Sequence, residues 1–515
     1  MRQVRAAGGV FLGGTLVGGL ALAVACGTLG KNSPDADADW NTTGDGGTDS
    51  GQPEDPPEDT GDTGGDTGEP PAPACEELAP ATWTLVPQDT NGMSTPVQAR
   101  ASVLEGWRTF DHISVRSYEF LNFYRFDHPR PPPGELDLAA QLRKEADGRY
   151  TLHLAVVSEV REPQDRPPLN LVLSVDTSGS MGSVDMDLAR AVVMGVAGKL
   201  DQGDVVSLVS WNQDQYVLLE QHAVTMPYDM QLAMAAGRLE SGGATNLSGA
   251  LIEAYRLAEA AWIPGGLNRV LVVSDGGTNM GQTDVELIRS MAGERGEHGI
   301  FLVGVGVGDA LDYHDGIMDS ITDAGQGPGL FVATPTDVRT VLHDRFEELV
   351  DVAALDLSLD LTLPAGFQRV DMEPDPREGT PDVGADSQNL APGRALVLHQ
   401  VLATDCPELA GEDAPIQATV RWTEPFTGAP RTATATWTLG ELLAGDTALL
   451  EKSEAVIAYA EALKQLKQGA DLEAAAAGLA LARQKLDQAR ASEPLDPELQ
   501  EIDRILAALE QGAGG

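Results

Sequence analysis

The stretch NLVLSVDTSGSMGS, residues 170–183, ends an apolar run and then presents three oxygen-bearing side chains at alternate positions, Asp176, Ser178 and Ser180. The apolar part has the length of a buried strand, and two glycines loosen the backbone that follows it. In an extended turn, alternate residues can point the same way. The stretch therefore predicts a buried strand whose carboxyl end carries a cluster of hard oxygen atoms.

Short apolar runs and helical periods alternate over residues 166–350. The predicted strands are NLVLSV (170–175), DVVSLVSW (204–211), RVLVVSD (269–275), IFLVGVGV (300–307) and LFVAT (330–334). Helical patterns lie between them at 186–200, 246–262 and 283–294. Continuous apolar strands separated by helices indicate an α/β domain with a doubly wound, mostly parallel sheet covered on both faces. In such a sheet, binding sites lie beyond the carboxyl ends of the strands.

The flanks of this α/β unit, residues 75–165 and 351–445, have a β-rich pattern. Two alternating runs surround Asp147-Gly148 within residues 136–160, which is a hairpin signal. Further alternating runs follow the α/β unit, LDLSLDLTL at 355–363 foremost. Neither flank alone has enough strands for a sandwich core, so we expect the α/β domain to be inserted in a discontinuous β-sandwich-like domain. Residues 446–515 show helical periods and predict a C-terminal helical segment.

Two later loops of the α/β unit add oxygen ligands to the first. Thr245 lies in SGGATNLSGA (241–250), and Asp275 lies in VVSDGGTNMG (272–281). The glycines of both loops allow close approach of the backbones. Hydroxyls, carboxylates and water suit Mg²⁺ first, with Mn²⁺ or Ca²⁺ next. For Asp176 alone, capping of the following helix is an equal alternative, but capping does not explain Thr245 and Asp275.

The three loops, in this order, resemble the metal-ion-dependent adhesion site of the von Willebrand factor A (VWA) domain. The segments NFYRFDHPRP (122–131), PLNLVLSVDTSGSM (168–181), GGATNLSGAL (242–251) and NRVLVVSDGGTNMGQTD (268–284) are similar to bacterial exported proteins of this family. The resemblance implies that Ser178, Ser180 and Thr245 bind the metal directly or through water. It implies that Asp176 and Asp275 act mostly through water, and that one coordination position stays open for a carboxylate of a protein partner.

The resulting functional hypothesis is an adhesion-type, metal-dependent protein-binding module. The alternative is a structural or assembly factor of the cell envelope, in which the metal mainly stabilises the domain. We expect no enzyme and no catalytic residue, because His-Glu-x-x-His, Gly-x-Ser-x-Gly and Gly-Lys-Ser/Thr patterns are all absent from the sequence.

The N-terminus has the layout of a secretory signal, with Arg2 and Arg5 before an uncharged run that ends in small residues. The ending LAVACG resembles a bacterial lipoprotein box, which implies cleavage after residues 1–25 and lipidation of Cys26. An ordinary signal peptide and an uncleaved membrane helix are the alternatives. Residues 26–74 are rich in acids, Gly and Pro, and are expected to form a disordered, extended linker. The expected location is therefore the cell envelope.

The formal net charge of −45 over 515 residues excludes nucleic acid as a natural partner. The same charge repels anionic lipid, so contact with a membrane is expected only through the lipid anchor. Besides Cys26, the chain contains two cysteines, Cys75 and Cys406. In an exported protein this pair can form one disulfide or remain as two thiols.

Overall fold

The computed structural model describes residues 75, 78–85, 91–105, 113–277, 282–292, 299–310, 313, 315–373, 389–467 and 472–513. The predicted signal peptide, Cys26 and the acidic linker lie outside these residues. Within them, no helix is long and apolar enough to cross a membrane.

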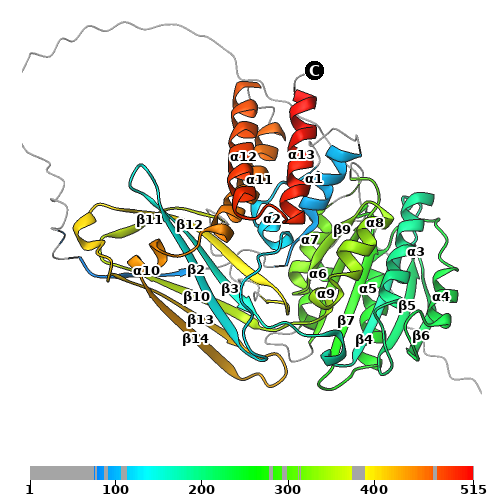
Figure 1. The fold of residues 1–515 in the computed structure, drawn as a ribbon. Helices are drawn as coiled ribbons and strands as arrows, with labels where there is room; N and C mark the ends of the chain where they lie inside the picture. Colours follow the sequence, from blue (N-terminus) through cyan, green and yellow to red (C-terminus); the bar gives the residue numbers. More distant parts are fainter. Residues whose placement is uncertain are drawn as a thin grey trace, which may run out of the picture. The chain divides into compact units, whose positions relative to one another are not determined.

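Residues 169–332 contain a six-stranded sheet with the strand order β6-β5-β4-β7-β8-β9 (Figure 1). The strands are β4 Leu169–Asp176, β5 Val205–Trp211, β6 Gln215–Ala223, β7 Leu267–Ser274, β8 Ile300–Val307 and β9 Gly329–Val332. All neighbours are parallel except β6, which runs antiparallel to β5 at one edge. Every residue of β4, β7 and β8 is buried, because protein covers both faces of the sheet.

Helices connect these strands and pack on the sheet. Their bounds are α3 Ser183–Ala197, α4 Met230–Ala236, α5 Leu247–Ala260, α6 Gln282–Ala292, α7 Asp315–Ala324, α8 Pro335–Asp337 and α9 Phe346–Val350, with a π-helical turn at Val338–His343. Each predicted strand and helix of the α/β unit is present within a few residues of its expected place. The predicted mostly parallel α/β fold is thereby confirmed. Strand β6, helices α4, α7, α8 and α9 and the π-helical turn were not predicted.

Two antiparallel four-stranded sheets form a sandwich, with the orders β1-β10-β13-β14 and β11-β12-β3-β2. The strands are β1 Ala81–Leu85, β2 Leu136–Lys144, β3 Tyr150–Ser158, β10 Leu355–Leu363, β11 Phe367–Glu373, β12 Ala395–Thr404, β13 Pro415–Thr423 and β14 Pro430–Thr438. Apolar side chains of both sheets, such as Leu154 and Leu361, share one core. Strands β1 to β3 precede the α/β domain and β10 to β14 follow it, so the α/β domain is an insertion.

The N-terminal flank, residues 75–165, differs from the β-rich expectation because it also contains two helices. These are α1 Ser94–Leu104 and α2 Ser117–Phe123. Both helices are largely buried, and α1 contacts β9 of the inserted domain. The flank therefore supplies helices as well as strands, and its helix α1 covers the β9 edge of the six-stranded sheet.

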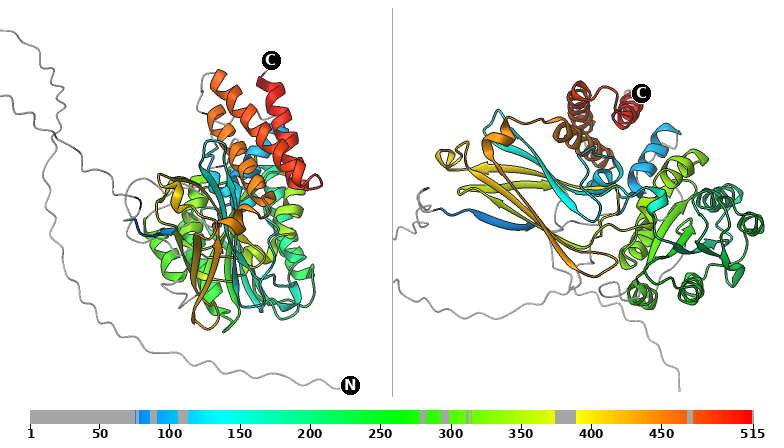
Figure 2. Two further views of the ribbon diagram at one scale, coloured as in Figure 1. Left: turned by 60° about the vertical axis from the view of Figure 1, so that its left-hand side comes forward. Right: turned by 60° about the horizontal axis from the view of Figure 1, so that its bottom comes forward.

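The C-terminal segment consists of the predicted helices, α11 Ala448–Lys467, α12 Leu472–Ser492 and α13 Pro497–Ala513, after a short α10 Leu439–Leu443. The last helix runs one residue past Gly512, where the sequence predicted its end. The long helices lie side by side in both views of Figure 2, and α11 also packs on α2 and β3. The rings of Tyr459 and Phe120 meet edge to face with centroids 5.3 Å apart.

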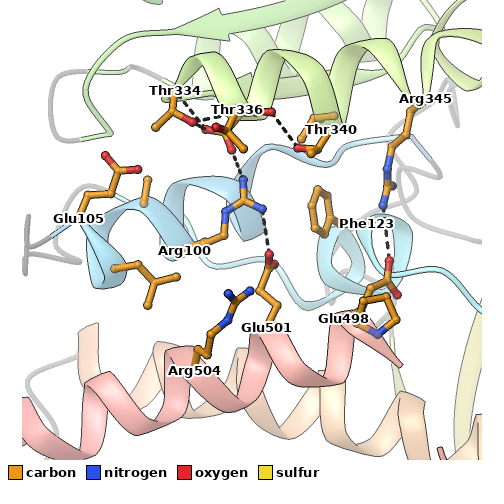
Figure 3. A pocket seen from close by; sticks show the side chains of 15 residues that line it. Arg100, Glu105, Phe123, Thr334, Thr336, Thr340, Arg345, Glu498, Glu501 and Arg504 are labelled. Carbon is orange, nitrogen blue, oxygen red and sulfur yellow. Dashed lines mark hydrogen bonds and ion pairs between the residues drawn. The ribbon is translucent and has the colours of Figure 1, made fainter. Parts of the chain in front are cut away.

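Arg100 connects three segments that are far apart in the sequence. From α1, its guanidinium pairs with Asp337 at the end of α8 and with Glu501 of α13. These contacts form one wall of a 620 Å³ cavity whose lining includes Glu105 and Arg504 (Figure 3). The C-terminal helices are thus held to the body by ion pairs as well as by apolar packing.

The structure joins Cys75 and Cys406 in a disulfide across 331 residues of sequence. Cys75 lies just before β1, and Cys406 follows β12. The bond therefore closes a loop that contains the whole inserted domain.

Candidate metal site

The first loop of the candidate site begins where β4 ends, at Asp176. This carboxylate is fully buried and accepts two hydrogen bonds, from the backbone N–H of Ser178 (2.8 Å) and from Oγ of Ser274 (2.8 Å). Burial raises the pKa of Asp176 to about 6, and the charge of Asp275 also raises it, while the two hydrogen-bonding serines oppose the shift. The carboxylate is therefore fixed in position between the ends of β4 and β7.

The first loop then brings its two serine hydroxyls together. Oγ of Ser178 lies 3.0 Å from Oγ of Ser180. Ser178 is 1% exposed, whereas Ser180 faces solvent at the start of the segment that leads into α3. The residue Ser178 is thus buried, whereas Ser180 lies at the surface.

The second loop, which contains Thr245, is tied to the first by backbone hydrogen bonds. The N–H of Gly179 donates to the carbonyl of Gly243 (2.9 Å), and the N–H of Gly242 donates to the carbonyl of Thr177 (2.8 Å). A Cβ on Gly179 would lie 3.1 Å from the carbonyl oxygen of Gly243, so a side chain at this position would crowd the contact between the two loops. Thr245 follows two residues later, directly before the residue that caps α5.

The third loop follows β7 and places Asp275 beside the serines. Its Oδ1 accepts a hydrogen bond from the N–H of Gly277 (2.8 Å). A Cβ on Gly277 would lie 3.1 Å from Oδ1 of Asp275 and 3.5 Å from Oγ of Ser180. Asp275 and Ser180 therefore flank the same glycine. Residues 278–281 lie outside the described part of the chain.

The structure thus gathers the five predicted ligand residues, though by different means. Asp176, Ser178, Ser180 and Asp275 are connected by direct contacts and shared neighbours. Thr245 is brought near them through the hydrogen bonds of its loop.

Three supporting side chains were not found from the sequence: Ser274, Asn212 and Gln213. Asn212 donates its side-chain amide to the carbonyl of Gly242 (2.8 Å), and Oε1 of Gln213 accepts from the N–H of Ala244 (3.1 Å). Ser274 could have been found, because it directly precedes Asp275. The other two lie in the turn before β6, an edge strand that the apolar pattern does not reveal.

The donor chemistry fits a small divalent cation. Only hydroxyl and carboxylate oxygens are offered, and the site contains two neighbouring acids. Elsewhere in the described residues, the one group of three His, Cys, Asp or Glu side chains close enough for a single ion is Cys75, Cys406 and Glu408. Since the two sulfur atoms of that group are joined in the disulfide, it is not a competing metal site.

Residues 170–343 match the family model of the von Willebrand factor type A domain. These residues are therefore a VWA domain, as the motif resemblance predicted. Domains of this family commonly mediate protein interaction or adhesion.

Two relatives are similar to this chain over the same region. The uncharacterized protein YfbK of Escherichia coli (strain K12) is 28% identical over 214 residues, which are 41% of this chain and 37% of the relative. The uncharacterized protein sll0103 of Synechocystis is 23% identical over 215 residues, 41% of this chain and 49% of the relative. The chain therefore spans less than half the length of each relative. Among solved structures, the von Willebrand factor type A protein from Catenulispora acidiphila is 16% identical with a TM-score of 0.45, covering 70% of this chain and 87% of that one.

Proposed function

We propose that the chain is a metal-dependent protein-binding module of the cell envelope. Ser178, Ser180 and Thr245 hold a divalent ion, Mg²⁺ first and Mn²⁺ or Ca²⁺ next, with Asp176 and Asp275 acting mostly through water. The ion supplies a positive charge and a coordination position that a carboxylate of a partner protein can fill. No residue of the site is assigned a catalytic role.

The observation that carries this proposal is the convergence of three loops that offer only oxygen donors. The Ser178 and Ser180 hydroxyls are 3.0 Å apart, and two carboxylates lie close enough for the charge of Asp275 to raise the pKa of Asp176. A cation between the two carboxylates relieves this repulsion. A hydrolytic role for Ser180 has less support, because its hydroxyl contacts that of Ser178, and no histidine is hydrogen-bonded to either serine within the described residues.

An exported location is part of the same proposal. A lipid on Cys26 would hold the protein at a membrane, and the acidic linker would give the folded part reach. An oxidising compartment agrees with the disulfide between Cys75 and Cys406.

The second candidate is an envelope structural or assembly factor in which the metal stabilises the domain only. The observation in its favour is that Asp176 is already satisfied by two hydrogen bonds of the protein. The two candidates differ in one property, which is whether a bound ion accepts an outside carboxylate.

The test has two stages and uses the protein freed of metal by a chelator. Calorimetric titration with Mg²⁺ should show one site, and Ser180→Ala should weaken the affinity by at least about tenfold, because the variant loses one oxygen ligand at a solvent-facing position. Ser183→Ala removes an exposed hydroxyl at the start of α3 and should leave the affinity unchanged. Absence of Mg²⁺ binding by the parent protein, or equal affinity of Ser180→Ala, would overturn the metal site.

The second stage uses the Mn²⁺-loaded protein and acetate as the carboxylate probe. If the ion has an open position, Mn²⁺ should strongly relax the carboxyl carbon of labelled acetate, and Ser180→Ala at the same Mn²⁺ concentration should reduce the effect. Metal binding without acetate relaxation would reject the partner-docking function in favour of the structural role.

A further inference from the structure

Three histidines lie where the sandwich meets the C-terminal helices. His153 of β3 is fully buried, His128 of segment 124–135 is 6% exposed, and His399 of β12 is opposite His153 in the strand register. Nε2 of His128 lies 3.1 Å from Nε2 of His153, and the two rings stack with centroids 5.2 Å apart. Among the described residues, no hydrogen bond or ring contact links the His128–His153 pair to the candidate metal site.

The hydrogen bonds around His153 determine where its proton resides. Oγ of Ser453, on α11, donates its only proton to the carbonyl of Leu450 (2.8 Å). It must therefore accept from Nδ1–H of His153, which lies 3.2 Å away. A neutral imidazole carries one N–H, so Nε2 of His153 is an acceptor, and His128 donates to it from its own Nε2. A directed chain of hydrogen bonds thus runs from segment 124–135 through β3 to α11.

This chain can accommodate one extra proton but not two. With one, either ring can be charged while a single proton remains between the two Nε2 atoms. With two, an N–H would face an N–H at 3.1 Å and two positive rings would stack in a buried place. We propose that His128 and His153 form a proton-operated latch, which holds segment 124–135 and helix α11 on the sandwich at neutral pH and releases them when both rings are protonated.

The latch lies among the contacts that hold the C-terminal helices. In segment 124–135, the N–H of Arg125 donates to Glu498 of α13 (2.8 Å). The ammonium of Lys452 on α11 lies 5.6 Å from the centre of the Phe126 ring. At the start of α11, the N–H of Leu450 donates to Oε1 of Gln141 on β2 (2.8 Å). Separation of the two rings would therefore loosen the attachment of α11 and α13 together.

The surroundings of both rings oppose protonation. Burial lowers the pKa of His128 to about 4, with Arg130 adding to the shift and with Asp127 and Asp137 acting against it. Burial lowers the pKa of His153 well below its usual range, and the neighbouring His128 and His399 lower it further.

The third ring has charged neighbours of both signs. Burial lowers the pKa of His399 to about 4, with Glu454 and Asp371 raising it and with Lys485 and Arg143 lowering it.

Because the pKa values of these histidines are lowered in the closed state, the closed state should lose stability as the pH falls. A histidine whose pKa is lower in the closed state contributes stability that is complete above its unfolded pKa, near 6.5, and is lost as the pH falls through its lower native value. For His128, with a native pKa of about 4, protonation should raise the population of the open state about twentyfold between pH 7 and pH 5. His153, whose pKa is also lowered, should add to this rise.

The experiment measures hydrogen exchange of the full chain at neutral pH and at about pH 5, corrected for the intrinsic exchange rate. Exchange in 124–135 and 448–467 should rise steeply at the lower pH. His128→Gln keeps an N–H donor for His153 but cannot titrate, so the rise should shrink by about twentyfold. His222→Gln removes a partly exposed histidine of β6 and should change nothing. A wild-type rise in His128→Gln would overturn the latch.

A second measurement does not depend on any variant. Nitrogen chemical shifts of labelled histidine in the unmodified protein should show His153 protonated on Nδ1 and bare on Nε2 at neutral pH. The opposite tautomer would reject the hydrogen-bond chain and the latch with it.

Discussion

Replacement of Gly243 by alanine should damage the metal site more than the fold. Gly243 has a φ of +90°, and the carbonyl of this residue accepts the hydrogen bond that ties the second loop to the first. An L-residue at positive φ costs about 1–2 kcal/mol. The new Cβ would also lie 2.7 Å from Oε1 of Gln213, so that the hydrogen bond from Ala244 to this side chain is lost at a further cost of about 1 kcal/mol.

Gly148 provides a matched control. It lies in the turn between β2 and β3 with a φ of +89°, and a Cβ there would meet nothing within 4 Å. Gly148→Ala should therefore show the backbone cost alone, about 1–2 kcal/mol, against about 2–3 kcal/mol for Gly243→Ala. Only Gly243→Ala should also lower the affinity for Mg²⁺, by at least about tenfold, because it displaces the loop that carries Thr245.

Two assays separate these effects. Urea unfolding in the presence of chelator reports the stability of the metal-free protein, and calorimetric titration of the folded variants reports the affinity for Mg²⁺. Parent-like Mg²⁺ affinity of Gly243→Ala, or an equal loss of affinity in Gly148→Ala, would show that the position of the second loop does not determine metal binding.

Two further perturbations test contacts that stabilise the sandwich and the inserted domain. Reduction of the disulfide between Cys75 and Cys406, which closes a loop of 331 residues, should destabilise the sandwich by up to about 6 kcal/mol, and calorimetry with and without reductant should show a smaller shift for the inserted domain. Asp204→Ala should cost about 3–5 kcal/mol in chemical denaturation, because it leaves the buried Arg166 without its ion pair and the N–H of Leu169 without an acceptor. A loss of under about 1 kcal/mol in Asp204→Ala would contradict the role of its ion pair. Equal shifts of the sandwich and inserted-domain melting transitions on reduction would contradict the role of the disulfide.

The parallel strands and the candidate site of the inserted domain could be predicted from the sequence because two signals coincide there. The strands β4, β7 and β8 are buried on both faces and therefore read as unbroken apolar runs. Asp176 and Asp275 lie at the carboxyl ends of two such runs, where parallel strands bring side chains together. Strand β6 has no such signal, since it lies at an edge and its residues are mostly exposed.

Helix α1 was not predicted because it is buried rather than exposed. Its residues are buried on nearly every side, including Thr95 and Gln98, so polar and apolar positions do not alternate with a helical period. Thr95 is tolerated there because its Oγ1 donates to the carbonyl of Ser114 and its N–H donates to Glu119. The pair of His128 and His153 likewise has no local pattern, because only the fold brings two residues 25 positions apart into contact.

The candidate site and the two connections to the sandwich lie at opposite ends of the parallel strands of the six-stranded sheet. The chain enters the domain near Leu169, where β4 begins, and leaves it near Val350, whose carbonyl accepts a hydrogen bond from Arg269 near the start of β7 (2.7 Å). An ion pair between Arg161 and Asp351 (2.6 Å) joins the two connections. Both connections therefore lie at the amino ends of the parallel strands, whereas the loops of the candidate site follow the carboxyl ends. A partner that docks on those loops approaches the edge opposite the connections, so docking does not require the inserted domain to separate from the sandwich.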